Sequence, residues 1–195
     1  MLINWKLREL NLKIVYYGPP FSGKTTNLIQ IHSRVDEKKR SELVSLKTQE
    51  DRTLYFDFLQ LELGKINGLT PKIHLYTVPG QANYESSRRL VLQGADGVVF
   101  VADLHADSLG ANIKAWKHMH DHLVSFGIVP ARFPTVVQFN KIDLPEALPV
   151  DRVADQMQVN GLPRIPAAAI QGQGVQDTLK TILQGVMQSI SRQIA

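Results

Sequence analysis

One stretch of this 195-residue chain restricts its fold more than any other. Residues 18–25 read Gly-Pro-Pro-Phe-Ser-Gly-Lys-Thr, which matches the pattern G-x-x-x-x-G-K-[ST] of a phosphate-binding loop. An apolar, strand-like segment (residues 12–17) precedes the motif, and a helix-like segment (residues 24–34) begins inside it. Strand, loop and helix in this order are the context that the motif requires, so we expect the loop to hold the phosphates of a nucleotide.

The residues of this loop have separate predicted roles. Because Pro19 and Pro20 carry no backbone N–H, the amide donors to phosphate must come from residues 21–25. The Lys24 ammonium is expected to reach the outer phosphates, and the Thr25 hydroxyl to bind Mg²⁺. The predicted nucleotide-binding residues of the loop and the helix start are Gly18, Phe21, Ser22, Gly23, Lys24, Thr25 and Thr26.

Composition excludes several other classes of protein. The chain has no cysteine, so disulfides and thiolate metal sites are ruled out. No apolar run of about 18 residues is present, and the N-terminus does not look like a signal peptide, so the default expectation is a cytoplasmic protein without an integral membrane segment. A net charge of +4 with a pI near 9.3 is too mild to indicate nucleic-acid binding.

Strand-like and helix-like segments alternate along the chain. Strands are expected at residues 12–17, 53–63, 72–77, 97–103, 135–140 and 164–169, and helices at 24–34, 85–93, 108–126, after Pro149, and through 175–190. Residues 2–6 are a candidate extra strand, and residues 35–52 look irregular. The alternation predicts a single α/β domain over residues 1–195, with a doubly wound, mostly parallel sheet, helices on both faces and one antiparallel hairpin (53–77).

The long helix expected at 108–126 shows an apolar spacing that predicts its buried face. The residues assigned to that face are Leu109, Ile113, Trp116, His120, Leu123 and Val124.

A second motif, Asn140-Lys141-Ile142-Asp143, follows the strand expected at 135–140 and lies about 115 residues after the phosphate loop. In a doubly wound sheet this position is at the same edge as the phosphate loop. The Asp143 carboxylate can accept the N1–H and N2 protons of guanine, whereas adenine would face it with an acceptor. Asn140 is expected to tie this loop to the phosphate loop, and the stem of Lys141 to lie over the base.

The segment after the last strand is a weaker candidate for a contact with the base. Ala168 and Ala169 are small enough for a close approach, and the Ala169 N–H could donate to guanine O6. Alanines at the end of a strand are also common without any such role.

Two segments between these motifs are candidate nucleotide sensors. Thr53 ends the irregular stretch, and its hydroxyl could complete the Mg²⁺ shell when a γ-phosphate is present. Gly80 follows the strand at 72–77, and its amide could meet the γ-phosphate, while Gln81 could orient an attacking water.

Four motifs in this order and spacing resemble those of Ras-like small GTPases, which are P-loop NTPases, and the likeness covers nearly the whole chain. Within that family the chain is most similar to the bacterial MglA-type group, whose members act in cell polarity and gliding motility. The segments that carry the resemblance are residues 13–18, 52–54, 56–58, 74–81 and 96–103. Most Ras-like proteins have Asp where Thr77 stands, whereas MglA-type proteins have Thr.

The resemblance implies a function and a set of partners. It implies GTP and GDP as ligands with Mg²⁺, slow hydrolysis of GTP, and reversible binding of polarity or motility effectors. The family's own arginine finger falls on Arg52, beside Thr53. A homodimeric roadblock-type (MglB-like) protein is the implied regulator, with possible recruitment to a cell pole or membrane by partners, and the chain itself is expected to be a monomer.

The sequence departs from the common Ras pattern at two positions, and both leave alternatives open. Pro20 stands where the loop usually has Gly, and side chains there tend to obstruct the arginine and the hydrolytic water. Asp57 could replace the carboxylate missing at Thr77, or it could be an ordinary solvent-facing residue of its strand. The other interpretations of the chain are a GTP-dependent binding module with negligible hydrolysis and, with less support, a phosphotransferase on the same fold.

Overall fold

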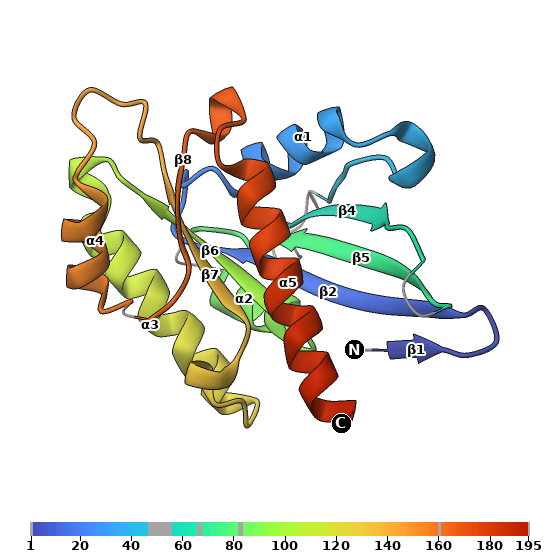
Figure 1. Ribbon diagram of the computed structural model, residues 1–195. Helices are drawn as coiled ribbons and strands as arrows, with labels where there is room; N and C mark the ends of the chain where they lie inside the picture. The colour runs from blue at the N-terminus through green and yellow to red at the C-terminus, as the bar shows by residue number, and fades with distance from the viewer. Residues whose placement is uncertain (1, 47–55, 66–67, 82–83, 160, 195) are drawn as a thin grey trace.

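The structure is a computed structural model that describes residues 2–46, 56–65, 68–81, 84–159 and 161–194. The described strands form an eight-stranded sheet with helices on both faces (Figure 1). The order along the sheet is β3 (Val44–Leu46), β4 (Phe56–Glu62), β5 (Thr70–Thr77), β2 (Glu9–Tyr17), β6 (Gly97–Asp103), β7 (Thr135–Asn140) and β8 (Arg164–Ala167), and β1 (Leu2–Asn4) pairs with β2.

The centre of the sheet is parallel, as the alternation of strands and helices predicts. β2 runs parallel to β5 on one side and to β6 on the other, and β6, β7 and β8 continue in the same direction. The carboxyl ends of these strands therefore lie at one edge of the sheet. The predicted doubly wound, mostly parallel sheet is confirmed.

Antiparallel pairing is more extensive than expected. The predicted hairpin is present, with Leu59 of β4 opposite Leu75 of β5. The candidate strand at residues 2–6 is present as β1, which pairs with β2, and an unexpected pair joins β3 to β4. β3 lies in the segment 35–52 that looked irregular, which also contains a 3₁₀ turn at Glu37–Lys39. β3 is only three residues long and Val44 is exposed, so it leaves no alternating pattern in the sequence.

Two apolar cores lie on the two faces of the sheet. One packs α1 (Lys24–Arg34) and α5 (Val175–Ile194) against the sheet, and the other packs α2 (Glu85–Leu92), α3 (Leu109–Ser125) and α4 (Val150–Met157). Figure 1 shows α5 in front of the sheet and α2 behind it. From Ile14 to Tyr17, alternate residues of β2 enter opposite cores, which explains why this second half of the strand is apolar without interruption.

The buried face of α3 differs from the predicted one. Leu123 is buried as predicted, whereas Ile113 and Val124 are exposed, and Asn112, Met119 and His122 are buried in addition. Asn112 faces inward because its amide exchanges two hydrogen bonds with the Asp103 backbone, at 2.9 and 2.7 Å. These bonds stabilise a polar residue in the core, and the apolar spacing alone therefore missed Asn112 and wrongly included Ile113 and Val124, although Leu109 and Trp116 pack on the core as predicted.

Candidate nucleotide site

Four loops meet at the carboxyl edge of the sheet, as the strand order requires. They follow β2, β5, β7 and β8 and comprise residues 18–25, 78–81, 140–143 and 168–171. The fold therefore brings together all the predicted site segments that the structure describes. Arg52 and Thr53 lie outside the described residues, so their predicted roles as cis arginine and Mg²⁺ ligand stay predictions.

The backbone of the phosphate loop requires its glycines. Gly18 has φ 147°, and a Cβ there would lie 2.3 Å from the Val101 carbonyl oxygen. Gly23 has φ 99°, and a Cβ there would lie 2.2 Å from Asn140 Nδ2. Phe21 also has a left-handed backbone, with φ 60°, and its side chain is 86% exposed. Such a conformation is unusual for a bulky residue, and no core contact at this side chain compensates for it.

Lys24 is buried beneath this loop. Its Nζ donates to the carbonyl oxygens of Pro19, at 2.6 Å, and Gly18, at 3.1 Å. Burial lowers the pKa of Lys24 to about 7; nearby Arg88 also lowers it, whereas Asp57 and Asp103 oppose the shift. A phosphate at this position would supply the negative charge that the ammonium lacks here.

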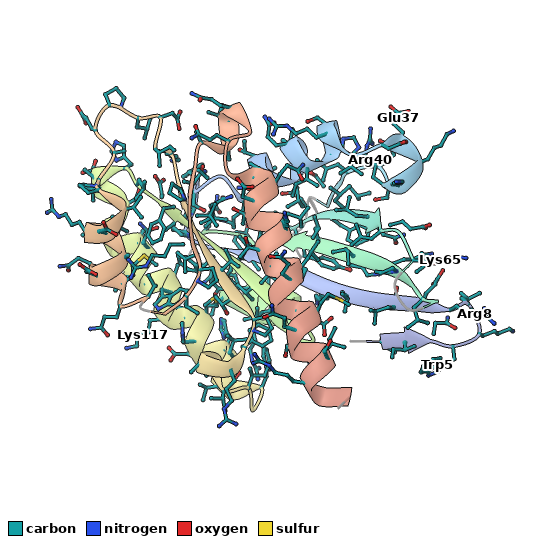
Figure 2. All side chains as sticks on the ribbon, viewed as in Figure 1. Trp5, Arg8, Glu37, Arg40, Lys65 and Lys117 are labelled. Carbon is teal, nitrogen blue, oxygen red and sulfur yellow. The ribbon has the colours of Figure 1, made fainter. Side chains whose placement is uncertain are left out.

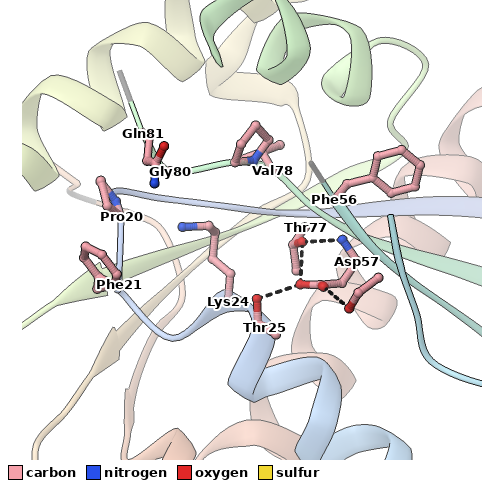
Figure 3. Close-up of a pocket in the computed structure, with 12 residues that line it drawn as sticks. Pro20, Phe21, Lys24, Thr25, Phe56, Asp57, Thr77, Val78, Gly80 and Gln81 are labelled. Carbon is pink, nitrogen blue, oxygen red and sulfur yellow. Dashed lines mark hydrogen bonds between the residues drawn. The ribbon is translucent and has the colours of Figure 1, made fainter. Parts of the chain in front are cut away.

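Asp57 of β4 points into the site and is only 9% exposed. Its carboxylate accepts hydrogen bonds from the hydroxyls of Thr25, at 2.6 Å, Thr77, at 2.9 Å, and Ser45, at 2.6 Å (Figure 3). The Asp57 N–H in turn donates to Thr77 Oγ1, at 2.8 Å. The alternative of an ordinary solvent-facing residue is therefore wrong, and Asp57 belongs to the site.

This cluster of oxygens has the chemistry that Mg²⁺ prefers. A pocket of about 240 Å³ is lined by Lys24, Thr25, Asp57, Thr77 and Gly80, among others (Figure 3). Mg²⁺ sites commonly use one or two protein oxygens, with phosphates and water completing the shell. Because the Thr25 proton is directed to Asp57, the lone pairs of Thr25 Oγ1 are free for a cation. The residues present therefore fit Mg²⁺.

The loop after β5 is held against the phosphate loop. A Cβ on Gly80 would lie 2.4 Å from Pro20 Cα, so only glycine allows this approach. The buried Arg88 of α2 donates to the Gln81 carbonyl oxygen, while Gln81 itself is exposed at the mouth of the pocket. The sequence did not indicate Arg88, because an arginine on a short helix is usually exposed.

Asn140 ties its own loop to the phosphate loop, as predicted, and it also contacts the loop after β8. Its Nδ2 donates to the Ser22 carbonyl oxygen, at 2.7 Å, and its Oδ1 accepts from the Ala169 N–H, at 2.8 Å. The Ala169 amide assigned to guanine O6 thus donates to Asn140 in this structure, and its contact with a base stays a prediction. A base oxygen at this position would have to share that amide with Asn140.

The rest of the second motif also lies at this edge. The Lys141 ammonium pairs with the Asp103 carboxylate at 2.6 Å, which fixes the head of the side chain. Asp143 is exposed, and no protein group occupies its carboxylate among the hydrogen bonds and ion pairs of the described residues. The carboxylate is therefore available to a ligand.

A buried polar network supports the phosphate loop from below. Asn27 of α1 exchanges hydrogen bonds with Gln138 of β7, at 2.8 and 2.9 Å, and Gln138 also donates to Thr178 of α5, at 2.9 Å. Asn27 Nδ2 additionally reaches the Gly23 carbonyl oxygen. This network fixes the start of α1 relative to the sheet, and nothing in the local sequence patterns predicted it.

The chain is similar in sequence to several known proteins. Residues 13–188 match the sequence profile of the Ras family. The chain is 44% identical over 190 residues, 97% of both chains, to the mutual gliding-motility protein MglA of Myxococcus xanthus. It is 26% identical over 178 residues to elongation factor 4 of Thermus thermophilus, covering 84% of this chain but 27% of that protein.

Proposed function

The chain belongs to the Ras family of small GTPases, and we propose that it is an MglA-like switch that controls gliding motility or cell polarity through its nucleotide state. As a member of this family it is a guanine-nucleotide-binding GTP hydrolase. The observation that carries the proposal is the contact of Asp57 with Thr25 and Thr77, because it supplies a carboxylate to a motif that lacks one. We further propose that residues 1–195 form one domain.

We assign the phosphates to residues 18–26. The backbone amides of residues 21–25 bind phosphate oxygens, and Lys24 turns from the Gly18 and Pro19 carbonyls to the outer phosphates. Thr25 would hold Mg²⁺ while Asp57 orients the Thr25 hydroxyl, and Thr53 would join in the GTP state. Bound Mg²⁺ would offset the negative charge of the β- and γ-phosphates.

We assign the base to the other side of the edge. Asp143 accepts from guanine N1–H and N2, and the stem of Lys141 covers the ring while its head stays on Asp103. Asn140 keeps this loop at a fixed distance from the phosphate loop, so that base and phosphates are read together. Ala168 and Ala169 line the edge, and their small side chains allow the base to approach.

For the chemical step we propose roles for three residues. The Gly80 amide meets the γ-phosphate, Gln81 positions the attacking water, and Arg52 acts as an arginine in cis. Arg88 keeps the Gln81 backbone in place through its hydrogen bond to the Gln81 carbonyl oxygen. Conversion of GTP to GDP would then change the shape of residues 35–60 and 78–90, with effector binding as the output.

A second candidate function is a GTP-dependent binding module with negligible hydrolysis. Pro20 favours it, because it lies against Gly80 and stands where Ras-like proteins usually have Gly, and side chains at that position tend to obstruct the arginine and the hydrolytic water. The same protein could then depend on a roadblock-type partner for turnover.

One experiment separates these functions. The nucleotide that co-purifies with the full chain is identified, and the release of γ-phosphate from GTP is measured with and without a roadblock-type protein. Guanine nucleotide with partner-stimulated turnover supports the switch, and guanine nucleotide with no turnover under either condition supports the binding module. A chain that transfers the γ-phosphate to an acceptor other than water would contradict both.

A further inference from the structure

The turn between β1 and β2 exposes large apolar side chains far from the candidate nucleotide site. We call residues 5–8 the tip; it consists of Trp5, Lys6, Leu7 and Arg8. Trp5 is 74% exposed and Leu7 60%, and neither belongs to the two cores. A single exposed apolar residue is ordinary, but an exposed Trp and Leu on one projecting turn form a patch that the fold does not use.

The tip is held out by a structured backbone. Ile3 pairs with Leu10 and packs on the core formed with α1 and α5. The Leu7 N–H donates to Asn4 Oδ1 at 3.1 Å. The Thr70 N–H donates to the Arg8 carbonyl oxygen at 2.8 Å and so anchors the turn to the start of β5. The exposure of Trp5 is therefore a property of the folded hairpin.

Positive charge surrounds these apolar groups. Lys6 and Arg8 alternate with them, and Lys65 in the β4–β5 connection lies at the same end of the molecule (Figure 2). None of the three cations makes an ion pair with the residues that the structure describes. Two acids lie near these cations in the chain: Glu9 is paired with Lys72 at 2.7 Å, and the exposed Glu62 faces Lys72 across the β4–β5 pair. Four cations (Lys6, Arg8, Lys65 and Lys72) against two acids (Glu9 and Glu62) leave this end of the sheet with an excess of positive charge around an apolar centre.

The position of the tip leaves the nucleotide site free. β2 begins at Glu9 beside the tip and ends at Tyr17 before the phosphate loop, which separates the two by roughly 30 Å of extended chain. A flat surface that touches the tip would not cover the pocket at the carboxyl edge. Partners could therefore still reach the loops that sense the nucleotide.

We infer that the tip docks on the interfacial region of a bilayer that contains anionic lipids. Indole rings favour the headgroup level of a membrane, and Lys and Arg side chains keep their charges at the lipid phosphates while their stems contact apolar groups. Trp and Arg are also enriched in protein interfaces, but Lys is depleted there, so the two exposed lysines beside Trp5 favour a lipid surface over a protein partner. Two apolar side chains with three cations give weak, reversible and salt-sensitive attachment, which does not depend on GTP hydrolysis.

The test uses the full-length chain with GDP and vesicles of phosphatidylcholine, with or without phosphatidylglycerol. The chain has two tryptophans, so Trp116→Phe leaves Trp5 as the sole fluorescent reporter. We expect its emission to shift to the blue on anionic vesicles, and the wild-type chain to co-sediment with them at low salt. Trp5 emission that does not move at any lipid concentration would overturn the inference.

Matched variants locate the contact. Each cation removed, in Lys6→Gln or Lys65→Gln, should weaken co-sedimentation about fivefold, and Trp5→Ser about tenfold or more. Lys117→Gln and Val124→Ser remove an exposed cation and an exposed apolar residue on α3 and should change nothing (Figure 2). Equal losses in the tip and α3 variants, or none in the tip variants, would place the attachment elsewhere. All these side chains are exposed, and equal melting temperatures confirm that the variants fold.

Discussion

The Thr25 hydroxyl donates a 2.6 Å hydrogen bond to the Asp57 carboxylate, although 32 positions separate the two residues in the sequence. Thr77, where most Ras-like proteins carry an aspartate, donates to the same carboxylate and accepts from the Asp57 backbone. The carboxylate at this end of the antiparallel pair therefore lies on β4 rather than at the end of β5, and it contacts the Thr25 hydroxyl.

Nucleotide affinity is expected to depend on pH through Lys24. The pKa of Lys24 is about 7 in the nucleotide-free protein, and the charged form is the one that binds phosphate. Below pH 7 the ammonium is already present; above it, binding must take up a proton, so affinity should fall about fivefold from pH 7 to pH 8. Calorimetric titration with GDP at pH 8 in buffers of different ionisation enthalpy should show this uptake. GDP binding at pH 8 without proton uptake would contradict a pKa of about 7 for Lys24.

Asp143→Asn should change the preferred base from guanine to xanthine. The amide presents a donor where the carboxylate accepted the N1–H, so GTP affinity should fall by at least about 100-fold while XTP affinity rises. Competition between the two nucleotides measures the change, with Asp155→Asn on α4 as a control in an exposed position. Unchanged GTP affinity in the Asp143 variant would show that another group reads the base.

Phe21→Gly should fold at least as well as the wild type. The side chain is 86% exposed and its backbone is left-handed, so glycine removes strain of about 1 kcal/mol and loses little packing. Phe100→Ala in the core should instead lose about 3–5 kcal/mol. Urea unfolding of both variants compares these free energies. A large loss in Phe21→Gly would mean that Phe21 packs in a way that the structure does not show.

Arg52→Ala and Gln81→Leu should bind GTP normally and hydrolyse it slowly. An arginine that stabilises the transferring phosphoryl group contributes about 10³–10⁵ in rate, which corresponds to roughly 4–7 kcal/mol. Single-turnover rates with a roadblock-type partner measure the loss, and nucleotide affinity is determined separately. Should Arg52→Ala keep the stimulated wild-type rate, the catalytic arginine comes from another residue or from the partner.

The sequence predicted those parts of the fold that rest on local patterns. The apolar strands β2, β6 and β7, the helix after the phosphate loop and the placing of the motifs at one edge are all confirmed. The role of Asn140 as a tie was also foreseen, because strand order alone places it beside the phosphate loop. These features depend on residues that are close in sequence or on simple rules of topology.

The features that the sequence did not predict depend on pairings between distant polar residues. Arg88 and the Asn27–Gln138–Thr178 network are buried only because each finds a partner from another element. Asn112 of α3 is buried for the same reason, because its side chain bonds to the Asp103 backbone. Asp57 stayed undecided between two roles until β4 and β5 were placed side by side, since burial and hydrogen bonding at a strand residue are set by tertiary contacts.

The magnesium dependence of GTP affinity in Asp57 variants tests the site most directly. Asp57→Asn should weaken GTP binding in Mg²⁺ by about 10–100-fold, because the asparagine cannot hold the Thr25 hydroxyl with a full charge. Binding in EDTA should change little, and Asp121→Asn on α3 should behave as the wild type. Adding Thr77→Asp to Asp57→Asn returns a carboxylate to the site and should restore most of the loss. If Asp57→Asn binds GTP in Mg²⁺ as tightly as the wild type, the carboxylate at residue 57 does not replace the missing aspartate.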